Sequence, residues 1–147
     1  EGMVGYSLGK KDLKLFKTII KNSFLLSSLT GLFISIIYFF INENIINLMS
    51  DIESIKKLSS TYAIWLILLP FIASFCYQFD GIFIGCSQTK ELRNAMIFSV
   101  LCYLLISITL TKYLSNTGVW ISLCLFMILR GLSLFYYLDK IYQRFDF

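Results

Sequence analysis

Asp80 is the residue of this chain best placed to do chemistry, because it interrupts a stretch that is otherwise uncharged. Between Tyr62 and Thr89 it is the only formally charged side chain. An ionisable group in the apolar part of a bilayer costs at least about 2.5–3.5 kcal/mol on insertion scales. Such a group persists where it is paired, faces water or binds something. The pattern therefore predicts a cation-coupling or substrate site at Asp80.

Arg130 is a second charge inside an apolar run, Gly118–Leu138. With a helical rise of about 1.5 Å per residue, Asp80 and Arg130 lie roughly 10 and 12 Å from the same face of the membrane. Three alternatives follow for the Arg130 side chain. It pairs with Asp80, extends to the cytoplasmic membrane–water interface, or caps the C-terminus of a helix elsewhere. We favour the membrane–water interface or a partner other than Asp80; a direct pair would make Asp80 a poor proton carrier at neutral pH.

Four residues near Asp80 have types that matter in a membrane helix. Tyr77 shares the face of Asp80, so its hydroxyl can donate to the carboxylate or its ring can stack on a cation; filling apolar space is the alternative. Gly81 and Gly85 form a G-x-x-x-G spacing typical of close helix packing. Pro70 removes a backbone hydrogen bond in mid-helix, which predicts a kink that is either a hinge or only shape.

The rest of the chain lacks the motifs of soluble enzymes. Its four cysteines have no metal-ligand spacing, and it contains no histidine. No phosphate loop, dinucleotide fingerprint or nucleophile–base pair occurs. The sequence predicts no enzyme activity, no metal and no resident cofactor. It also predicts no nucleic-acid partner, because the basic residues do not cluster with exposed aromatic ones.

Four runs of the chain have the length and polarity of membrane spans. Hydrophobic residues make up 57% of the chain and charged residues 15%, whereas a soluble domain has about 25% charged residues. A spanning helix needs about 17–25 mostly apolar residues. The sequence predicts an all-α integral membrane protein in a lipid bilayer, with four helices over about 23–41, 62–86, 95–111 and 118–138.

Basic residues gather on one side of these spans. Nine lie before the first span, between the second and third, or after the fourth, and three lie in the other two loops. The nine are Lys10, Lys11, Lys14, Lys17, Lys21, Lys90, Arg93, Lys140 and Arg144, and the three are Lys56, Lys57 and Lys112. Positive charge marks the cytoplasmic side, which predicts a cytoplasmic C-terminus.

Residues 1–22 contain glycines and lysines but no span, so the chain divides into this segment and a four-helix segment, 23–147. The glycines of residues 1–9 indicate the end of a preceding helix and a glycine turn. Residues 10–21 are a basic cytoplasmic segment. Their lysine stripe fits either an amphipathic helix in the headgroup plane or the polar first turns of the next span.

Two further spacings predict local structure. Ser50 and Glu53 have the spacing of a capping box, which predicts a short outer helix running into the second span. Ser27, Gly31 and Ser35 lie four residues apart, which is typical of a helix face that packs closely on another.

Several segments together resemble the C-terminal part of multidrug and toxic compound extrusion (MATE) transporters, most closely the DinF-type branch. They occur in order, at family-like spacing, over essentially the whole chain. These segments are Glu1-Gly2-Met3-Val4-Gly5 with Gly9, Met49-Ser50-Asp51, Gln78-Phe79-Asp80-Gly81-Ile82-Phe83-Ile84-Gly85, Arg93-Asn94-Ala95-Met96 and Leu129-Arg130-Gly131.

The resemblance implies that the four spans are the ninth to twelfth of twelve helices, the last part of a C-terminal lobe. It implies that this chain is a piece of a secondary active antiporter in the bacterial inner membrane, whose N-terminal lobe is its partner. Such proteins export small organic, often cationic, compounds in exchange for protons or sodium ions, the coupling ions expected here.

By position, Asp80 matches the acidic residue of the tenth helix that is implicated in cation coupling in part of the family. In the DinF-type branch, coupling is usually placed on a first-lobe aspartate, which would leave Asp80 a structural or substrate-contact role. Two alternative functions remain: a lipid-linked oligosaccharide flippase of the same superfamily, and a non-transporting membrane scaffold.

Overall fold

The computed structural model describes residues 1–145, which are helical almost throughout. The helices are α1 (Gly2–Gly9), α2 (Leu13–Met49), α3 (Glu53–Gly85), α4 (Thr89–Leu114) and α5 (Asn116–Tyr142), followed by a 3-10 turn, η1 (Gln143–Phe145). The last two residues of the predicted segment 23–147 lie outside the described part, as does the side chain of Arg144.

The four long helices are all long and apolar enough to cross a membrane. Three of the predicted spans lie within longer helices, and the second one in the chain, 62–86, extends one residue beyond the end of α3. Many of their apolar side chains lie exposed on the outside of the bundle. Phe40, Leu105 and Ile108 are examples, with 70–73% of their surface exposed. Apolar surface on this scale requires lipid or further protein around it. The prediction of an all-α multi-pass membrane protein is confirmed.

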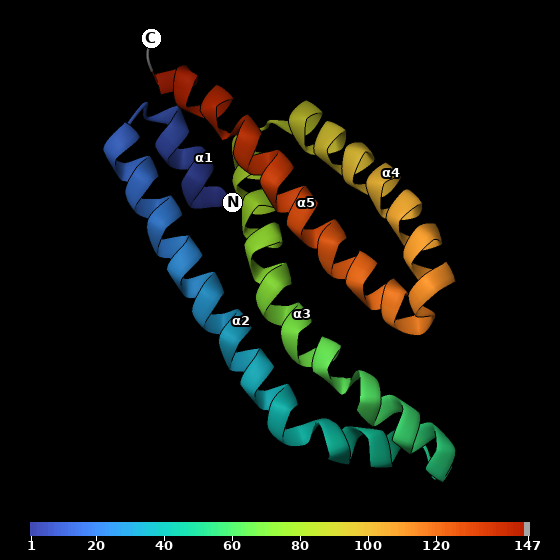
Figure 1. Cartoon of the computed structure of the whole chain (residues 1–147). Helices are drawn as coiled ribbons and strands as arrows, with labels where there is room; N and C mark the ends of the chain where they lie inside the picture. The colour runs from blue at the N-terminus through green and yellow to red at the C-terminus, as the bar shows by residue number, and fades with distance from the viewer. Residues whose placement is uncertain (146–147) are drawn as a thin grey trace.

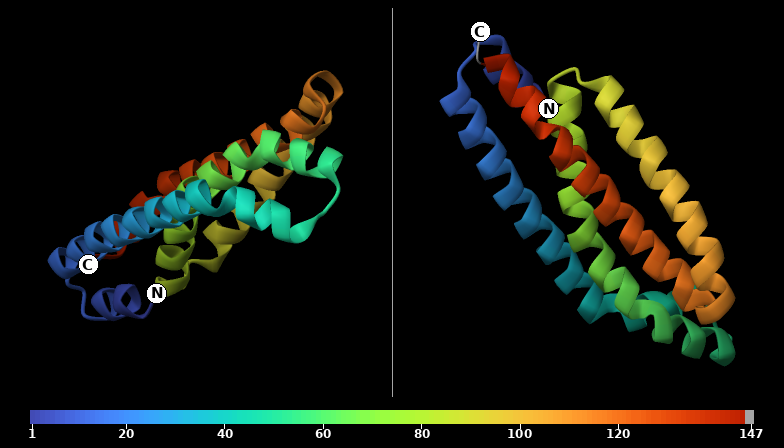
Figure 2. Two further views of the ribbon diagram at one scale, coloured as in Figure 1. Left: turned by 90° about the horizontal axis from the view of Figure 1, so that it is seen from below. Right: turned by 45° about the horizontal axis from the view of Figure 1, so that its top comes forward.

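The long helices form two antiparallel hairpins that meet through one pair of helices. α2 packs on α3, α4 packs on α5, and α3 packs on α5. Figure 1 shows them side by side in the order α2, α3, α5, α4, and Figure 2 shows the same arrangement from two other directions. The short helix α1 contacts α2 and α3 at the end where the chain also terminates.

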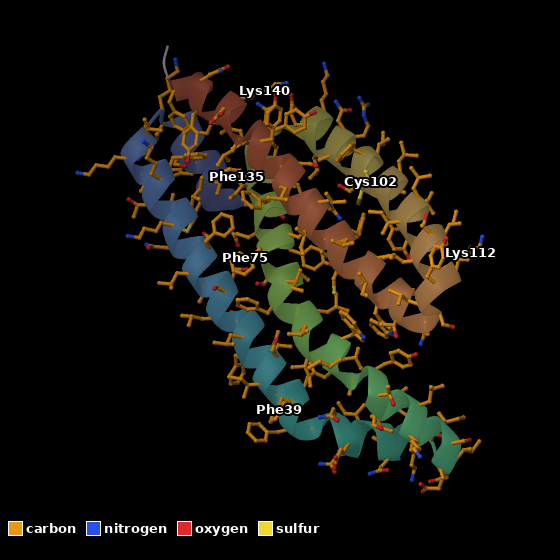
Figure 3. The ribbon with its side chains drawn as sticks, in the orientation of Figure 1. Phe39, Phe75, Cys102, Lys112, Phe135 and Lys140 are labelled. Carbon is orange, nitrogen blue, oxygen red and sulfur yellow. The ribbon has the colours of Figure 1, made fainter. Side chains whose placement is uncertain are left out.

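Charge separates the two ends of this bundle. The end that holds α1, the α3–α4 connection and η1 carries the lysines before the first span and those near Lys90 and Lys140. Figure 3 shows Lys140 at this end and Lys112 at the other. The structure thus places at one end the basic groups that the sequence assigns to one side of the membrane, and we call this the basic end.

The start of α2 decides between the two alternatives for residues 10–21. Asp12 accepts a hydrogen bond from the backbone amide of Leu15 at 2.9 Å and caps a single helix that continues to Met49. The lysine stripe therefore belongs to the polar first turns of a spanning helix. The glycine turn expected before it is instead a turn at Lys10–Asp12, in which Lys11 has φ of 54° and no described glycine has positive φ.

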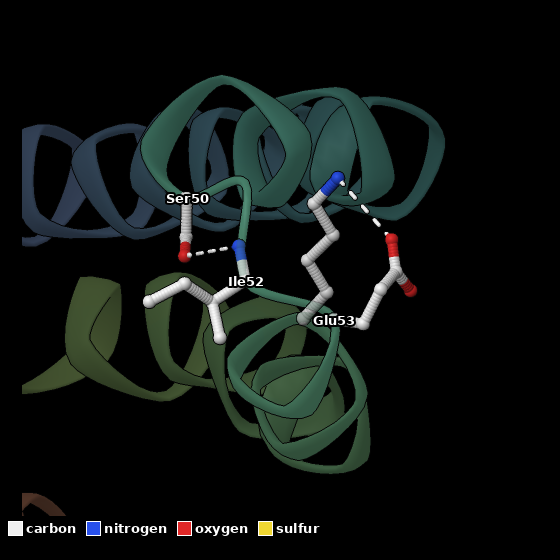
Figure 4. A network of polar contacts seen from close by, with 4 residues as sticks. Ser50, Ile52 and Glu53 are labelled. Atoms are coloured by element: carbon white, nitrogen blue, oxygen red, sulfur yellow. Dashed lines mark hydrogen bonds and ion pairs between the residues drawn. The ribbon is translucent and has the colours of Figure 1, made fainter.

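The predicted capping box does not form. Figure 4 shows the Ser50 hydroxyl accepting from the amide of Ile52, at 3.2 Å, while Glu53 lies 3.7 Å from the ammonium of Lys56. Ser50 has an extended backbone and ends α2, and Ile52 occupies the N-cap of α3. A capping box needs its serine at the N-cap itself, so Ser50 is two residues too early. The expected short outer helix is the first part of α3.

Close packing within the first hairpin depends on small residues that the sequence had singled out. A Cβ added to Gly31 would lie 2.8 Å from the hydroxyl of Ser74 and 3.1 Å from the carbonyl of Pro70. Next to this contact, the Ser27 hydroxyl donates to the Ser74 carbonyl at 2.9 Å. The stripe of small residues on α2 therefore lets the backbones of α2 and α3 approach, as the spacing predicts.

The second hairpin depends on a glycine that sequence reasoning missed. Only Ser115, with φ of 53°, separates α4 from α5, so the first turn of α5 lies against the last turns of α4. A Cβ on Gly118 would be 2.5 Å from the backbone carbonyl of Leu110. Any side chain there must push the two helices apart.

We therefore expect Gly118→Ala to destabilise the α4–α5 hairpin by about 1–3 kcal/mol, the usual cost of overpacking. Thermal unfolding of the full-length protein in detergent would report this as a lower Tm. Gly9→Ala is the matched control, because nothing lies within 4 Å of an added Cβ at that helical glycine. Equal Tm values for the two variants would contradict the proposed role of Gly118.

Candidate functional site: a buried ion pair between α3 and α5

Asp80 and Arg130 form an ion pair across the contact between the two hairpins. Nη2 of Arg130 lies 2.8 Å from Oδ2 of Asp80, and each side chain keeps 13% of its surface exposed. Their similar depths, estimated from helical rise, allow this contact. The structure thus adopts the arrangement that sequence reasoning favoured less, because α3 and α5 lie closer together than the sequence can show.

Small residues beside each charge allow the two helices to come this close. Cys76, one turn before Asp80, is 1% exposed. A Cβ on Gly131, the residue after Arg130, would lie 3.9 Å from the Cα of Cys76 and 3.9 Å from the ring of Phe79, at ordinary contact distance. Cys76 acts as a small apolar residue and forms no disulfide, and neither do the other three cysteines, all of which lie in the described part of the chain.

Aromatic rings next to Asp80 in the sequence and in space connect three helices. Phe79 precedes Asp80 and packs its ring against Phe24 of α2, with centroids 4.9 Å apart, and Phe135 of α5, 6.1 Å apart. Figure 3 labels Phe135 and Phe75, which belong to the same aromatic region between the helices. Sequence reasoning missed Phe24 and Phe135, since no periodic signal relates residues on different helices.

Each member of the pair retains one polar atom without a partner. Oδ1 of Asp80 and Nε of Arg130 are both buried and have no hydrogen-bond partner among the described residues. A buried polar group left unpaired costs about 1–3 kcal/mol, so these two atoms favour binding of a further group. Oδ1 can accept a proton or a cation, and the Nε hydrogen can be donated to an acceptor.

Tyr77 lies outside this site. Its side chain is 57% exposed and lines an open groove of about 560 Å³ between α2 and α3, together with Ser74 and Gln78. The predicted hydrogen bond from Tyr77 does not form, since Oδ1 has no partner among the described residues. Three residues turn a helix by about 300°, so the two side chains point about 60° apart: Asp80 is directed to α5, whereas Tyr77 borders the groove towards α2.

Pro70 also lines the groove beside α2 and does not interrupt α3, which is continuous from Glu53 to Gly85. Figure 1 shows α3 curving along its first half, and Pro70 can contribute to this curve because it leaves a carbonyl four residues earlier without its helical donor. The structure places Pro70 more than two helical turns from the ion pair.

Gly81 and Gly85 face α1. A Cβ on Gly85 would be 2.5 Å from the carbonyl of Glu1, and one on Gly5 would be 2.8 Å from the carbonyl of Gly85. The Cβ position of Gly81 lies 3.7 Å from the side chain of Glu1. The G-x-x-x-G spacing therefore holds α1 on α3, next to Asp80 but on another face.

No group of three or more His, Cys, Asp or Glu side chains able to hold a metal occurs within residues 1–145 as described. The chemistry of the site is consequently that of a single carboxylate with an arginine as counter-ion. Such a site can exchange one cation for another.

Comparisons with known proteins agree with the resemblance drawn from the sequence. The MatE family model matches residues 1–113. The chain is 33% identical over 134 residues to the DNA damage-inducible protein F of Escherichia coli (strain K12), a match that covers 91% of this chain and 29% of that protein. The chain therefore spans less than a third of the length of this relative. No solved structure matches it.

A double-mutant cycle tests whether the ion pair stabilises the fold as the geometry indicates. Asp80→Asn or Arg130→Gln alone leaves one buried charge uncompensated, a change that costs roughly 3–5 kcal/mol. We expect the double variant Asp80→Asn/Arg130→Gln to lose much less stability than the sum of the losses in the two single variants. The measured quantity is the free energy of unfolding of the full-length protein in detergent.

The pair Lys56–Glu53, in which the Glu53 side chain is 91% exposed, provides the control cycle, with an expected coupling of about 0–1 kcal/mol. If the losses of stability in the two single variants at Asp80 and Arg130 add up in the double variant, the two residues do not stabilise each other.

Proposed function

Because this chain belongs to the MatE family of membrane transporters, we propose that the protein containing it is a secondary active antiporter that exports small organic cations in exchange for protons or sodium ions. The remainder of that protein, including an N-terminal lobe, would complete the transport cleft, since the matched relative is more than three times as long as the matched region. The observation that carries the proposal within this chain is the buried Asp80–Arg130 pair.

Competition for one carboxylate gives the pair a physical basis for antiport. Arg130 neutralises Asp80 through Oδ2, while Oδ1 remains open. A proton or sodium ion that binds Asp80 weakens its attraction for Arg130. A cationic substrate competes for the same carboxylate. Because these cations exclude one another, binding of the coupling ion favours release of the substrate.

The pair is also placed to transmit this exchange to the helices. It lies where the two hairpins meet, so weakening it loosens the contact between α3 and α5. Next to the pair, α5 contacts α3 at Gly131 with ordinary van der Waals distances, so the two helices are not tightly interlocked there. Movement of α5 against α3 is therefore the conformational change that we assign to cation binding, with Pro70 as a flexible point of α3.

A lipid-linked oligosaccharide flippase is not favoured. Such a protein needs uncompensated positive charge in its cleft to hold an anionic pyrophosphate. Arg130 is the single basic residue within the four predicted spans, and Asp80 neutralises it.

The protein is a multi-pass membrane protein, and we assign it to the bacterial inner membrane with the basic end and the C-terminus in the cytoplasm. The relative in Escherichia coli supports the compartment. The concentration of lysines at one end supports the orientation, because positively charged loops remain on the cytoplasmic side.

Transport by the full-length protein in proteoliposomes tests the role of Asp80. We would follow efflux of a fluorescent organic cation under an imposed proton gradient and then under a sodium gradient; the gradient that drives efflux identifies the coupling ion. Asp80→Asn should abolish or strongly reduce efflux, because its amide cannot bind either ion as a carboxylate does.

The double variant Asp80→Asn/Arg130→Gln separates coupling from stability, since it removes the charge imbalance together with the carboxylate. We expect it to fold better than Asp80→Asn and yet remain inactive. Recovery of gradient-driven efflux in the double variant would give Asp80 a structural role only. Absence of efflux from the wild-type protein under both gradients, with several organic cations, would favour the scaffold alternative.

A further inference from the structure

Three lysines form an exposed stripe on the first turns of α2. Lys14, Lys17 and Lys21 recur every three to four residues, and all three are exposed. Such spacing places side chains on one face of a helix. No acidic residue follows in α2 until Glu43, and the three lysines form no ion pair within the described residues. This face therefore carries positive charge that no acidic side chain of residues 1–145 pairs with.

The same face becomes apolar one turn further along the helix. Leu25, Leu29 and Leu32 continue the spacing and keep 61%, 55% and 47% of their surface exposed. Lys21 and Leu25 are separated by one helical turn, about 5–6 Å. Because α2 is one helix that crosses the membrane, the stripe runs from the headgroup level into the acyl region. A cationic end followed by an apolar track has the polarity of a phospholipid.

The opposite side of these turns is anchored, which keeps Lys14 and Lys21 facing outward, while the exposed ammonium of Lys17 lies 5.8 Å from the centre of the Tyr142 ring at the edge of this anchor. Phe16 is 0% exposed and packs edge-on against Tyr142, with centroids 5.9 Å apart, and against Phe145 at 4.8 Å. Ile19 and Ile20 are buried beside it. The first turns of α2 cannot rotate without exposing this cluster, so the stripe is preorganised for a ligand.

We propose that this face, formed by Lys14, Lys17, Lys21, Leu25, Leu29 and Leu32, binds an anionic phospholipid. The lysine ammonium groups contact the phosphodiester, and an acyl chain lies along the leucines. Charge complementarity selects an anionic headgroup over a zwitterionic one, and the continuous apolar track selects a lipid over a free anion. The proposal is independent of the transported substrate and of the coupling ion.

Native mass spectrometry of the full-length protein tests this directly. The protein would be released from nanodiscs that contain equal amounts of phosphatidylglycerol and phosphatidylcholine with matched acyl chains. We expect the wild-type protein to retain phosphatidylglycerol preferentially. Lys14→Gln/Lys17→Gln/Lys21→Gln should lose most of this preference, roughly five-fold for each lysine neutralised. The corresponding triple arginine variant should keep it.

A matched control neutralises three lysines at the other end of the bundle: Lys56→Gln/Lys57→Gln/Lys112→Gln should retain phosphatidylglycerol as the wild-type protein does. Comparable Tm values in zwitterionic detergent show that both glutamine variants are folded. Equal retention of the two lipids by the wild-type protein, or an unchanged preference in the Lys14/Lys17/Lys21 variant, overturns the proposal. Displacement of the lipid by millimolar inorganic phosphate also overturns it, since that identifies a free-anion site.

Discussion

The arrangement of the helices depends on how a carboxylate is kept inside an apolar layer. Asp80 is tolerated because Arg130, on a helix far away in the sequence, supplies the opposite charge at 2.8 Å. The two residues belong to different hairpins, so their pairing also determines which faces of α3 and α5 meet. The contact is a structural requirement, since removing either charge leaves the other uncompensated, and the proposed cation exchange would use the same contact.

Close backbone approach provides the other constraint. In lipid, helices do not associate through the hydrophobic effect and rely on packing and polar contacts. Gly31 and Ser27 serve this purpose in the first hairpin, Gly118 in the second, and Gly85 where α1 docks. The contact between the hairpins near Gly131 has ordinary spacing instead. The two hairpins are thus tightly built, and the contact between them is the one to which we assign the movement in the proposed transport cycle.

The two ends of the molecule differ in their charge. Aromatic residues around Phe16 hold the start of α2 against the end of the chain, and lysines cover the outer face of the same turns. The proposed orientation and the proposed lipid contact therefore rest on the same distribution of charge at the basic end.

The sequence by itself determined the fold class, the four spans and the family, because hydrophobic length and short motifs are local properties of the chain. It also identified Asp80 and Arg130 as the unusual charges. Local capping was less predictable: Ser50 has the right spacing for a capping box, but the extended backbone at that residue places the helix start later.

Only the tertiary structure decided that Arg130 pairs with Asp80, that Tyr77 faces a separate groove, and that Gly118 is the tightest position of the second hairpin. These outcomes depend on the distance and rotation between helices distant in the sequence. Those quantities arise from side-chain packing across the interfaces, which no spacing within a single helix encodes.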